Sequence, residues 1–147
     1  MGNICRSPSA KGFFDFHVTR RELQEKFLSE SAGTHGWHTG CQPDRRSITA
    51  AARWGVDISH DVSRLIEAAD FNQFDWILAM DSDNLRHMEH IQPTGSSARL
   101  QLLLELDPDA GRLDVPDPYY GGEQGFDKVC QILHQATARL LDQLEAA

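Results

Sequence analysis

Two candidate buried strands constrain the fold of this chain more than any other feature. They are FDWILAM at residues 74–80 and ARLQLLLEL at residues 98–106. Runs that are apolar on both faces are typical of buried parallel strands, because helices cover both sides of such a sheet. A shorter run, KFLSESAGT at residues 26–34, is a third candidate strand. The pattern predicts an α/β fold, a parallel sheet with helices on both faces.

Helical patterns separate these runs. Ser7 followed by Pro8 indicates an N-cap and a first helical position, and the helix is expected to extend to about Lys26. Further helices are expected at residues 46–54, after a cap at Ser59, from residue 81 and at residues 126–144. The chain shows no repeat, linker or low-complexity tract, so residues 1–147 are expected to form a single domain.

Composition excludes several classes of function. The net charge of −8 disfavours nucleic acid and anionic membranes as partners. No apolar run reaches the roughly 18 residues that cross a bilayer, and no signal peptide precedes the first loop, so a cytoplasmic location is expected. Three cysteines are too few for a disulfide scaffold. The histidine pairs His35/His38 and His87/His90 have no second ligand pair at zinc spacing and are explained as solvated side chains, so no metal is expected. No cofactor is expected either.

The first ten residues, MGNICRSPSA, have the form of an anion-binding loop that leads into a helix. Backbone N–H groups of such a loop form a nest, and the positive end of the helix adds to its attraction for an anion. Arg6 would supply a planar fork for two phosphate oxygens. An ordinary helix start after a disordered terminus explains this stretch equally well. The phosphate-binding candidates are Gly2, Asn3, Ile4, Cys5, Arg6 and Ser7.

The stretch VPDPYYGG at residues 115–122 carries a second chemical signal. Asp117 stands between two prolines, so its backbone is stiff, and Tyr119 and Tyr120 follow it. A rigid carboxylate beside aromatic rings suits a general acid that acts on a ring-bearing substrate. A surface proline turn whose tyrosines cover the core is the alternative, and the stretch alone favours that alternative.

Taken together, five blocks resemble the low-molecular-weight protein tyrosine phosphatases in order and at the usual spacing: GNICRSP, SAGT with Trp37, DISH with Arg64, FDWILAMDSDNL and DPYYGG. The resemblance covers almost the whole chain. It implies a three-layer, flavodoxin-like fold of the phosphotyrosine phosphatase I type, with a parallel sheet between helices. It also implies hydrolysis of phosphotyrosine proteins through a cysteinyl-phosphate intermediate, and a tyrosine kinase as a further candidate partner.

The resemblance implies a role for each site residue. Arg6 would hold the equatorial phosphate oxygens, and Asp117 would protonate the leaving phenolate and then activate water. Ser7 would lower the pKa of the nucleophilic thiol. The strained backbone of Asn3 would be supported by Ser7, Ser31 and His60. The rim that grips the aromatic ring would consist of Trp37, Tyr119 and Tyr120.

The chain departs from the family at the nucleophile. The family's loop is Cys-x5-Arg, and counting back from Arg6 places the nucleophile immediately before Met1. Cys5 matches the family's second cysteine, a redox partner, and lies at the wrong point of the loop for in-line attack. Residues 1–147 are therefore expected to have little or no activity. A phosphate-binding or interaction module without catalysis is the alternative. An arsenate reductase is less well supported, because its cysteine relay is not found.

The resemblance also places an apolar central strand before Met1. Four or five buried aliphatic side chains contribute on the order of 6–15 kcal/mol, which is comparable to the whole stability of a domain, about 5–15 kcal/mol. We therefore expect one of two outcomes in a chain whose central first strand is missing. Either the chain self-associates through the gap between residues 27–33 and 74–80, or these two segments pair directly. Both outcomes would displace Gly2 to Arg6 from the family's loop geometry.

Overall fold

A computed structural model describes residues 5–36, 39–118 and 122–147. Strands β1 (Trp76–Ala79) and β2 (Arg99–Leu102) pair in parallel, with Trp76 opposite Arg99. The other elements are the helices α1 (Arg6–Arg20), α2 (Arg45–Ala52), α3 (Asp70–Gln73), α4 (Ser82–Ile91) and α5 (Gly122–Ala146), and the 3-10 helix η1 (Leu103–Leu106). Parallel strands with intervening helices confirm the predicted α/β class.

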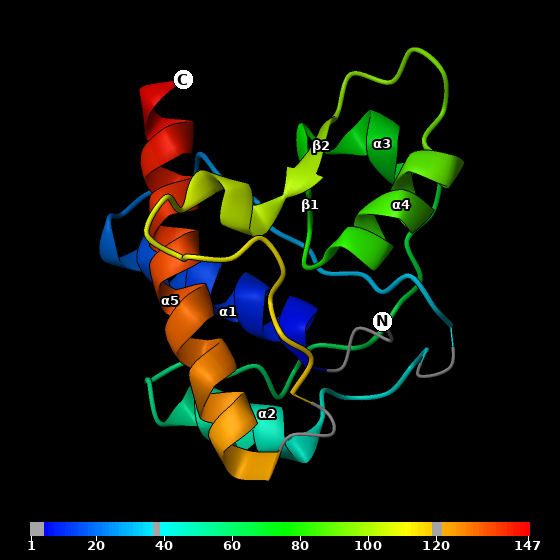
Figure 1. The fold of residues 1–147 in the computed structure, drawn as a ribbon. Helices are drawn as coiled ribbons and strands as arrows, with labels where there is room; N and C mark the ends of the chain where they lie inside the picture. Colours follow the sequence, from blue (N-terminus) through cyan, green and yellow to red (C-terminus); the bar gives the residue numbers. More distant parts are fainter. Residues whose placement is uncertain (1–4, 37–38, 119–121) are drawn as a thin grey trace.

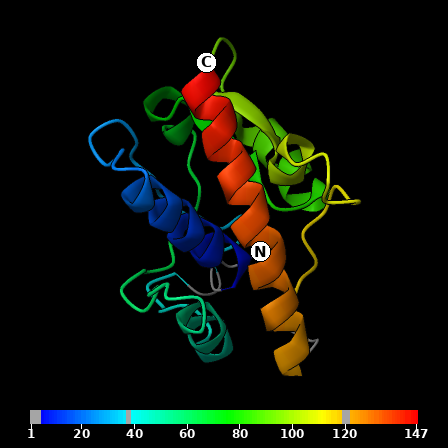
Figure 2. The same ribbon diagram turned by 90° about the vertical axis from the view of Figure 1, so that its left-hand side faces the viewer.

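Helices lie on both faces of the strands (Figure 1 and Figure 2). Helices α1, α2 and α5 pack with η1 around a first core, and α3 and α4 cover a second core. Strand β1 contributes to both, because Leu78 packs against the first core while Ile77 belongs to the second. The strand is therefore covered on both faces, as its apolar sequence predicts. Buried side chains of the first core include Phe13, Val18, Leu104, Leu133 and Leu141, and those of the second include Ile66, Phe71 and Met88.

Residues 27–32 do not form the predicted strand. Gly33 makes a parallel bridge to Leu65, but no backbone hydrogen bond joins residues 27–32 to β1 within the described part of the chain. A cavity of about 670 Å³ lies between them. The expected direct pairing of the two segments is therefore wrong. The side chain of Glu30 binds Arg64 at 3.0 Å, and this ion pair ties residues 27–32 to the chain around Leu65 rather than to β1.

Helix α1 begins and ends earlier than its sequence predicts. Its N-cap is Cys5, without a side-chain hydrogen bond, so Ser7 and Pro8 lie inside the first turn and Ser7 is not the cap. The helix ends at Arg20 rather than near Lys26. The reason is the left-handed backbone of Glu22, with φ of 56°, which a continuing helix does not allow.

Other boundaries differ because polar side chains form local hydrogen bonds. The helix expected after Ser59 is wrong, since the Ser59 N–H and Oγ both donate to the carboxylate of Asp57 and close a turn instead. The second predicted strand ends at Leu102, whose N–H donates to Oε1 of Glu105, and the rest of the run turns into η1. Helix α3 has no counterpart in the prediction. The helices α2, α4 and α5 are confirmed, with small shifts at their ends.

Candidate active site

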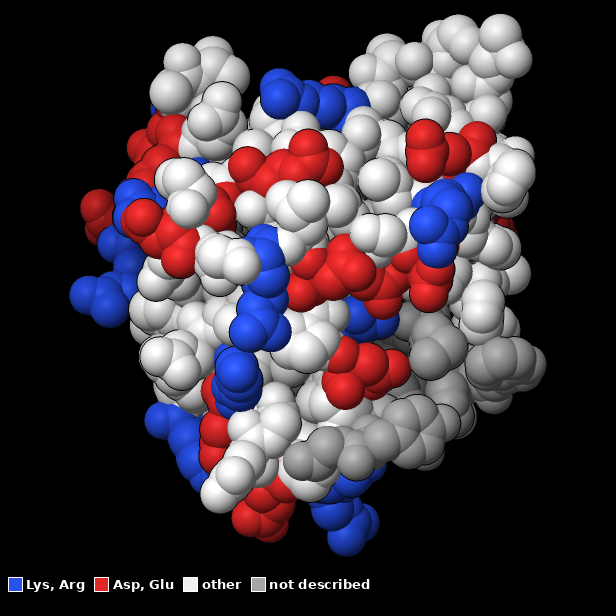
Figure 3. Space-filling view, in the orientation of Figure 1, with Lys and Arg blue, Asp and Glu red and all other residues white. Residues whose placement is uncertain are grey.

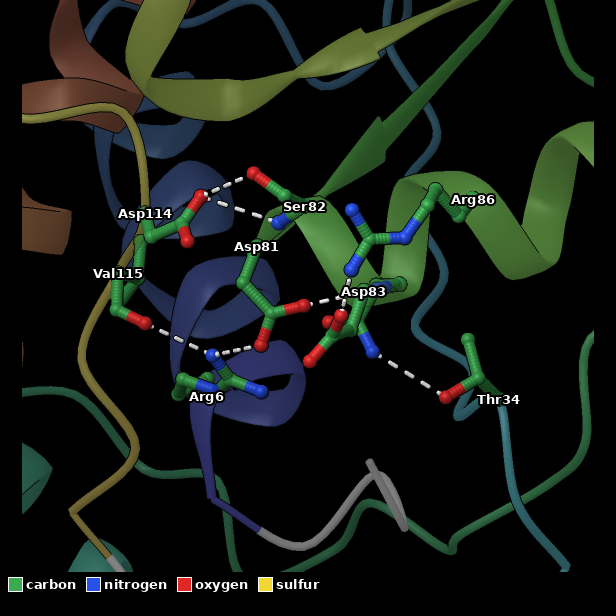
Figure 4. Close-up of polar contacts among 9 residues, drawn as sticks. Arg6, Thr34, Asp81, Ser82, Asp83, Arg86, Asp114 and Val115 are labelled. Carbon is green, nitrogen blue, oxygen red and sulfur yellow. Dashed lines mark hydrogen bonds and ion pairs between the residues drawn. The ribbon is translucent and has the colours of Figure 1, made fainter.

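Arg6 is held where α1 begins, beside the carboxyl end of β1. Its side chain is only 5% exposed, and its Nη1 donates to Oδ2 of Asp81 and to the carbonyl oxygen of Val115, both at 2.7 Å (Figure 4). These contacts fix the guanidinium through one nitrogen. In the described part of the chain, no hydrogen bond is formed by its Nε or Nη2. These two nitrogens are the donors that a bidentate contact to an oxyanion requires.

Asp81 connects the arginine to helix α4. Its Oδ1 accepts the backbone N–H of Asn84 at 2.8 Å and caps α4, while Oδ2 receives Arg6. Partial burial disfavours the charged carboxylate. The hydrogen bond from Asn84 and the ion pair with Arg6 outweigh burial, and they lower the pKa of Asp81 below its usual value. Asp81 is therefore a permanent counter-ion at neutral pH. The sequence indicates only a helix that begins at this position, although an acid directly after a buried strand is a signal for such a role.

The loop that carries Asp117 is fastened to the end of β1. The Val115 N–H donates to the carbonyl of Met80 at 2.8 Å. The Asp114 carboxylate accepts the Ser82 N–H at 3.0 Å and the Ser82 hydroxyl at 2.8 Å. On the other side of Asp117, Pro118 is buried. The backbone of Asp117 is thus held between two anchored residues, as its flanking prolines predict, while its side chain is exposed.

Cys5 is a protonated thiol at neutral pH. Burial raises the pKa of this thiol to about 11; a hydrogen bond with Ser47 lowers it, and the negative charges of Asp44 and Asp117 raise it further. A thiol with this pKa is a poor nucleophile. The effect of Asp117 on Cys5 also shows that the proline-flanked carboxylate lies within electrostatic reach of the start of α1.

Thr34 and Asn84 join two of the sequence blocks behind Arg6. The Asn84 Nδ2 donates to Oγ1 of Thr34 at 3.2 Å, and both residues are buried (Figure 4). Thr34 follows residues 27–33 and Asn84 follows β1. The contact therefore brings the carboxyl ends of these two segments together.

The remaining predicted site residues are less enclosed or lie outside the described residues. Ser7 and Ser31 are half-buried and line the cavity beside β1. The His60 side chain is 90% exposed, with its Nε2 at 3.5 Å from Oδ2 of Asp57. Their support of Asn3 stays a prediction. The predicted residues outside the described ranges are Gly2, Asn3, Ile4, Trp37, Tyr119 and Tyr120.

Two other kinds of feature, a metal-binding cluster and a membrane-spanning helix, are absent from the described residues. No three or more His, Cys, Asp or Glu side chains among residues 5–36, 39–118 and 122–147 are placed to hold a metal ion. None of the helices in these ranges is both long and apolar enough to cross a membrane.

Several known proteins that resemble this chain are described as low molecular weight phosphotyrosine protein phosphatases. The sequence profile of the low molecular weight phosphotyrosine protein phosphatases matches residues 1–147. An enzyme of that name from Schizosaccharomyces pombe is 40% identical over 127 residues, which cover 86% of this chain and 81% of the relative. The Homo sapiens enzyme of the same name is 40% identical over 133 residues, 89% of this chain and 83% of the relative.

Solved structures agree with the sequence relatives. The crystal structure of a protein tyrosine phosphatase from Entamoeba histolytica superposes with a TM-score of 0.95 at 36% identity, covering 99% of this chain and 93% of that one. Such an agreement over nearly the whole length confirms the flavodoxin-like α/β fold. With the profile match and relatives at 40% identity, it shows that this chain belongs to the low molecular weight phosphotyrosine protein phosphatase family.

Proposed function

We propose that the site around Arg6 binds the phosphoryl group of phosphotyrosine in protein substrates and stabilises its transfer. The observation that carries the proposal is the fixed guanidinium, held through Nη1 by Asp81 and Val115 while Nε and Nη2 make no hydrogen bond to the described residues. Catalysis of phosphoryl transfer depends on positioned charge. An arginine that is already ordered in this way needs little rearrangement when an oxyanion binds.

Asp117 is the acid of the proposed reaction. A cysteine thiolate attacks phosphorus, the bond from phosphorus to the tyrosyl oxygen breaks, and Asp117 gives its proton to that oxygen. Asp117 then takes a proton from the water that cleaves the cysteinyl-phosphate, releasing phosphate and regenerating the thiolate. The anchored backbone on both sides of Asp117 supports this role, because a general acid must be positioned within hydrogen-bond reach of the leaving oxygen.

We further propose that residues 1–147 alone hydrolyse phosphotyrosine only at trace rates. The Cys-x5-Arg pattern assigns the nucleophile to the position before Met1, and the buried Cys5 remains a thiol because its pKa is about 11. Phosphate binding without turnover is then the activity expected of these residues.

The test compares two proteins. One is residues 1–147, and the other carries at its N-terminus the segment that precedes the matching region in the Schizosaccharomyces pombe relative. The extended protein should hydrolyse a phosphotyrosine peptide, and its Arg6→Lys variant should lose most of kcat/KM, because lysine lacks the planar fork. Arg112→Lys, which changes an exposed arginine in the same way, should have no effect.

Two results would contradict the proposal. Ordinary turnover by residues 1–147, abolished by Cys5→Ser, would make Cys5 the nucleophile. Phosphate binding without turnover in the extended protein would favour the binding module instead.

The proposal also includes a protein substrate, an opposing tyrosine kinase and a cytoplasmic location. Acidic side chains gather in several groups over the face seen in Figure 3, with basic residues dispersed among them. This distribution and the net charge of −8 support a partner other than nucleic acid or an anionic membrane. Co-purification with a phosphotyrosine protein from the cytosolic fraction tests this assignment, and recovery in the membrane fraction would count against it.

A further inference from the structure

The first turn of helix α2 contacts both sides of the candidate site. The Asp44 carboxylate caps this helix by accepting the backbone N–H of Arg46 at 2.8 Å. The buried Ser47 side chain forms a hydrogen bond with the thiol of Cys5, the N-cap of α1. Helix α2 also packs beside the start of α5, which follows the loop that carries Asp117 (Figure 1). One turn of α2 therefore stands between the start of α1 and that loop.

Arg46 uses both the edge and the face of its guanidinium. Its Nε and Nη2 donate to the two carboxylate oxygens of Asp44, both at 3.1 Å, which is a bidentate contact. Its Cζ lies over the Phe126 ring, 4.6 Å from the ring centroid. A guanidinium over an aromatic ring combines stacking with a cation–π attraction. Because Phe126 is buried near the start of α5, Arg46 joins the starts of the two helices.

The contacts of Arg46 suit positioning rather than phosphate binding. In Arg6, Nε and Nη2 make no hydrogen bond to the described residues, whereas in Arg46 Asp44 occupies the same two nitrogens. Partial burial disfavours the charged form of Asp44. The hydrogen bonds from Arg46 outweigh burial and lower the pKa of that carboxyl. The pair is thus ionised at neutral pH, and the planar fork that an oxyanion would need is already filled.

The loop that carries Asp117 rests on the part of α5 that Arg46 holds. A Cβ added at Gly125 would lie 3.7 Å from Cα of Pro118, so the backbone of Pro118 packs directly on the helix beside Phe126. Pro118 is buried and directly follows Asp117. A displacement of the start of α5 would therefore move Pro118 and, with it, the carboxylate of Asp117.

Electrostatic effects on Cys5 place the same groups around the start of α1. Burial is the main reason why the pKa of the Cys5 thiol is raised. The carboxylates of Asp44 and Asp117 raise this pKa further, and the guanidinium of Arg46 lowers it. The charged pair of α2 and the proposed acid therefore lie within electrostatic reach of one atom.

We propose that Arg46 is a positioning residue for the general acid: by stacking on Phe126, it holds the loop of Asp117 at a fixed distance from the start of α1. The inference rests on the proposed function, in which Asp117 protonates the leaving oxygen. A general acid must lie within hydrogen-bond reach of that oxygen, and a misplacement of about 1 Å can lower the rate on the order of 10²-fold. Arg46 acts through the loop and touches none of the reacting atoms.

The kinetic test uses the N-terminally extended protein. Arg46→Met keeps a long side chain but removes the fork and the charge, so kcat for a phosphotyrosine peptide should fall roughly 10–100-fold. The loss should be much smaller for an aryl phosphate with an excellent leaving group, which needs little protonation. KM should change little, because Arg46 does not bind the substrate. Arg46→Lys keeps the charge but lacks the planar fork, and it should behave like Arg46→Met.

A double-mutant cycle separates positioning of the acid from a general loss of stability. In Asp117→Asn the acid is already absent, so adding Arg46→Met should lower kcat by no more than about a further twofold. Arg53→Met is the matched control, because Arg53 also links α2 to α5, through an ion pair with Asp127 at 2.6 Å. Both side chains of that pair are exposed, and such pairs contribute little. This variant should therefore retain kcat.

A structural measurement on residues 1–147 needs no turnover. The NMR Overhauser effect between the α protons of Pro118 and Gly125 should weaken in Arg46→Met and persist in Arg53→Met. Circular dichroism checks that the variants fold, and Arg46→Lys replaces Arg46→Met in every measurement if the methionine variant does not.

Four results would overturn the inference: equal losses of kcat on both kinds of substrate, multiplicative effects of Arg46→Met and Asp117→Asn, full activity in Arg46→Lys, or an unchanged contact between Pro118 and Gly125. Full activity in Arg46→Lys would mean that the charge matters rather than the stacked fork. If the unmodified extended protein is inactive, the proposed function fails, and the contact between Pro118 and Gly125 alone decides whether Arg46 positions the loop.

Discussion

At the residue scale, one carboxylate organises the candidate site. Asp81 caps α4 with one oxygen and holds Arg6 with the other, so the arginine and the helix that follows β1 are positioned by the same side chain. The Arg6 side chain is almost fully buried, and a buried guanidinium without a counter-ion is costly. Asp81 is therefore a positioning residue for the proposed phosphate-binding group.

This ion pair predicts a loss of stability in acid. The pKa of Asp81 is lowered in the fold, so the carboxylate stabilises the folded state above its unfolded pKa of about 3.9 and the benefit is lost as the pH falls through the folded value. Urea unfolding should show stability decreasing below about pH 4, and Asp81→Asn should flatten that decrease while retaining an amide that can cap α4. Asp109→Asn is the control, because its pair with Arg139 is exposed. If the free energy of unfolding of Asp81→Asn decreases with falling pH as steeply as that of the unchanged protein, another group causes the acid sensitivity.

Asp117→Asn tests the proposed acid directly. In the N-terminally extended protein, this change should lower kcat for phosphotyrosine by roughly 10²–10⁴-fold, the usual contribution of positioned proton transfer. The loss should be small for aryl phosphates with excellent leaving groups, which need little protonation. Asp109→Asn should leave both rates unchanged, because Asp109 is exposed and contacts Arg139 instead. Equal losses on both kinds of substrate would remove Asp117 from the role of acid.

The residues proposed for phosphate binding and proton transfer stand out in the sequence because each sits in a short block with its own turn chemistry. Arg6 at a helix start and Asp117 between prolines are examples. The sequence does not indicate the positioning roles of Asp81, Asp114 and the carbonyl of Val115. Their contacts with Arg6 and Ser82 join segments that are between 32 and 109 residues apart in the chain. No local pattern encodes such a pairing. It follows from the sheet, which brings the end of β1 beside both α1 and the Asp117 loop.

At the scale of elements, helix α1 depends on a close approach at Gly12. A Cβ at this position would lie 2.5 Å from Cγ2 of Ile58 and 2.8 Å from Cγ1 of Val56. Both are methyl groups of buried, branched side chains that have little freedom to move aside. Gly12 thus lets the segment around Ile58 pack directly on the helix.

Gly12→Ala should therefore destabilise the protein, by about 1–3 kcal/mol of overpacking, although alanine is the better helix former by about 1 kcal/mol. Gly125→Ala is the matched control in helix α5. The nearest atom to an added Cβ would be Cα of Pro118, at 3.7 Å, which is an ordinary contact. We expect this second variant to be neutral or slightly stabilised. Thermal unfolding of the two variants measures the difference, and equal melting temperatures would contradict it.

The sequence predicts correctly whether a segment is a helix or a strand where its apolar periodicity agrees with its tertiary contacts. Strand β1 and helix α5 are apolar on the faces that the fold buries. Residues 27–32 were predicted as a strand from composition, yet a strand requires partners for its backbone on at least one side, and this segment has none among the described residues. Likewise, leucines continue through ARLQLLLEL beyond the end of β2, and the hydrogen bond between Leu102 and Glu105 marks where the strand ends.

At the scale of the whole molecule, the interior consists of two cores rather than one. The first lies among α1, α2, α5 and η1, and the second beneath α3 and α4. Between them lie strand β1 and a channel, the cavity of about 670 Å³ that separates residues 27–32 from β1. Because the channel replaces side-chain contact by empty space, the cores are joined mainly through β1 and its neighbours. Packing changes in one core should therefore be transmitted weakly to the other.

A double-mutant cycle across the channel measures this coupling. Ile66→Val in the second core should cost about 0.5–1.5 kcal/mol and Leu140→Ala in the first about 2–5 kcal/mol. Their effects should add to within about 0.5 kcal/mol, since the two side chains line the channel from different cores. Phe14→Leu with Leu140→Ala is the control pair within the first core, where a larger coupling is expected. Urea unfolding measures the free energy of unfolding of each single and double variant. A coupling above about 1 kcal/mol for Ile66 with Leu140 would mean that the two cores already behave as one and that the channel is closed in solution.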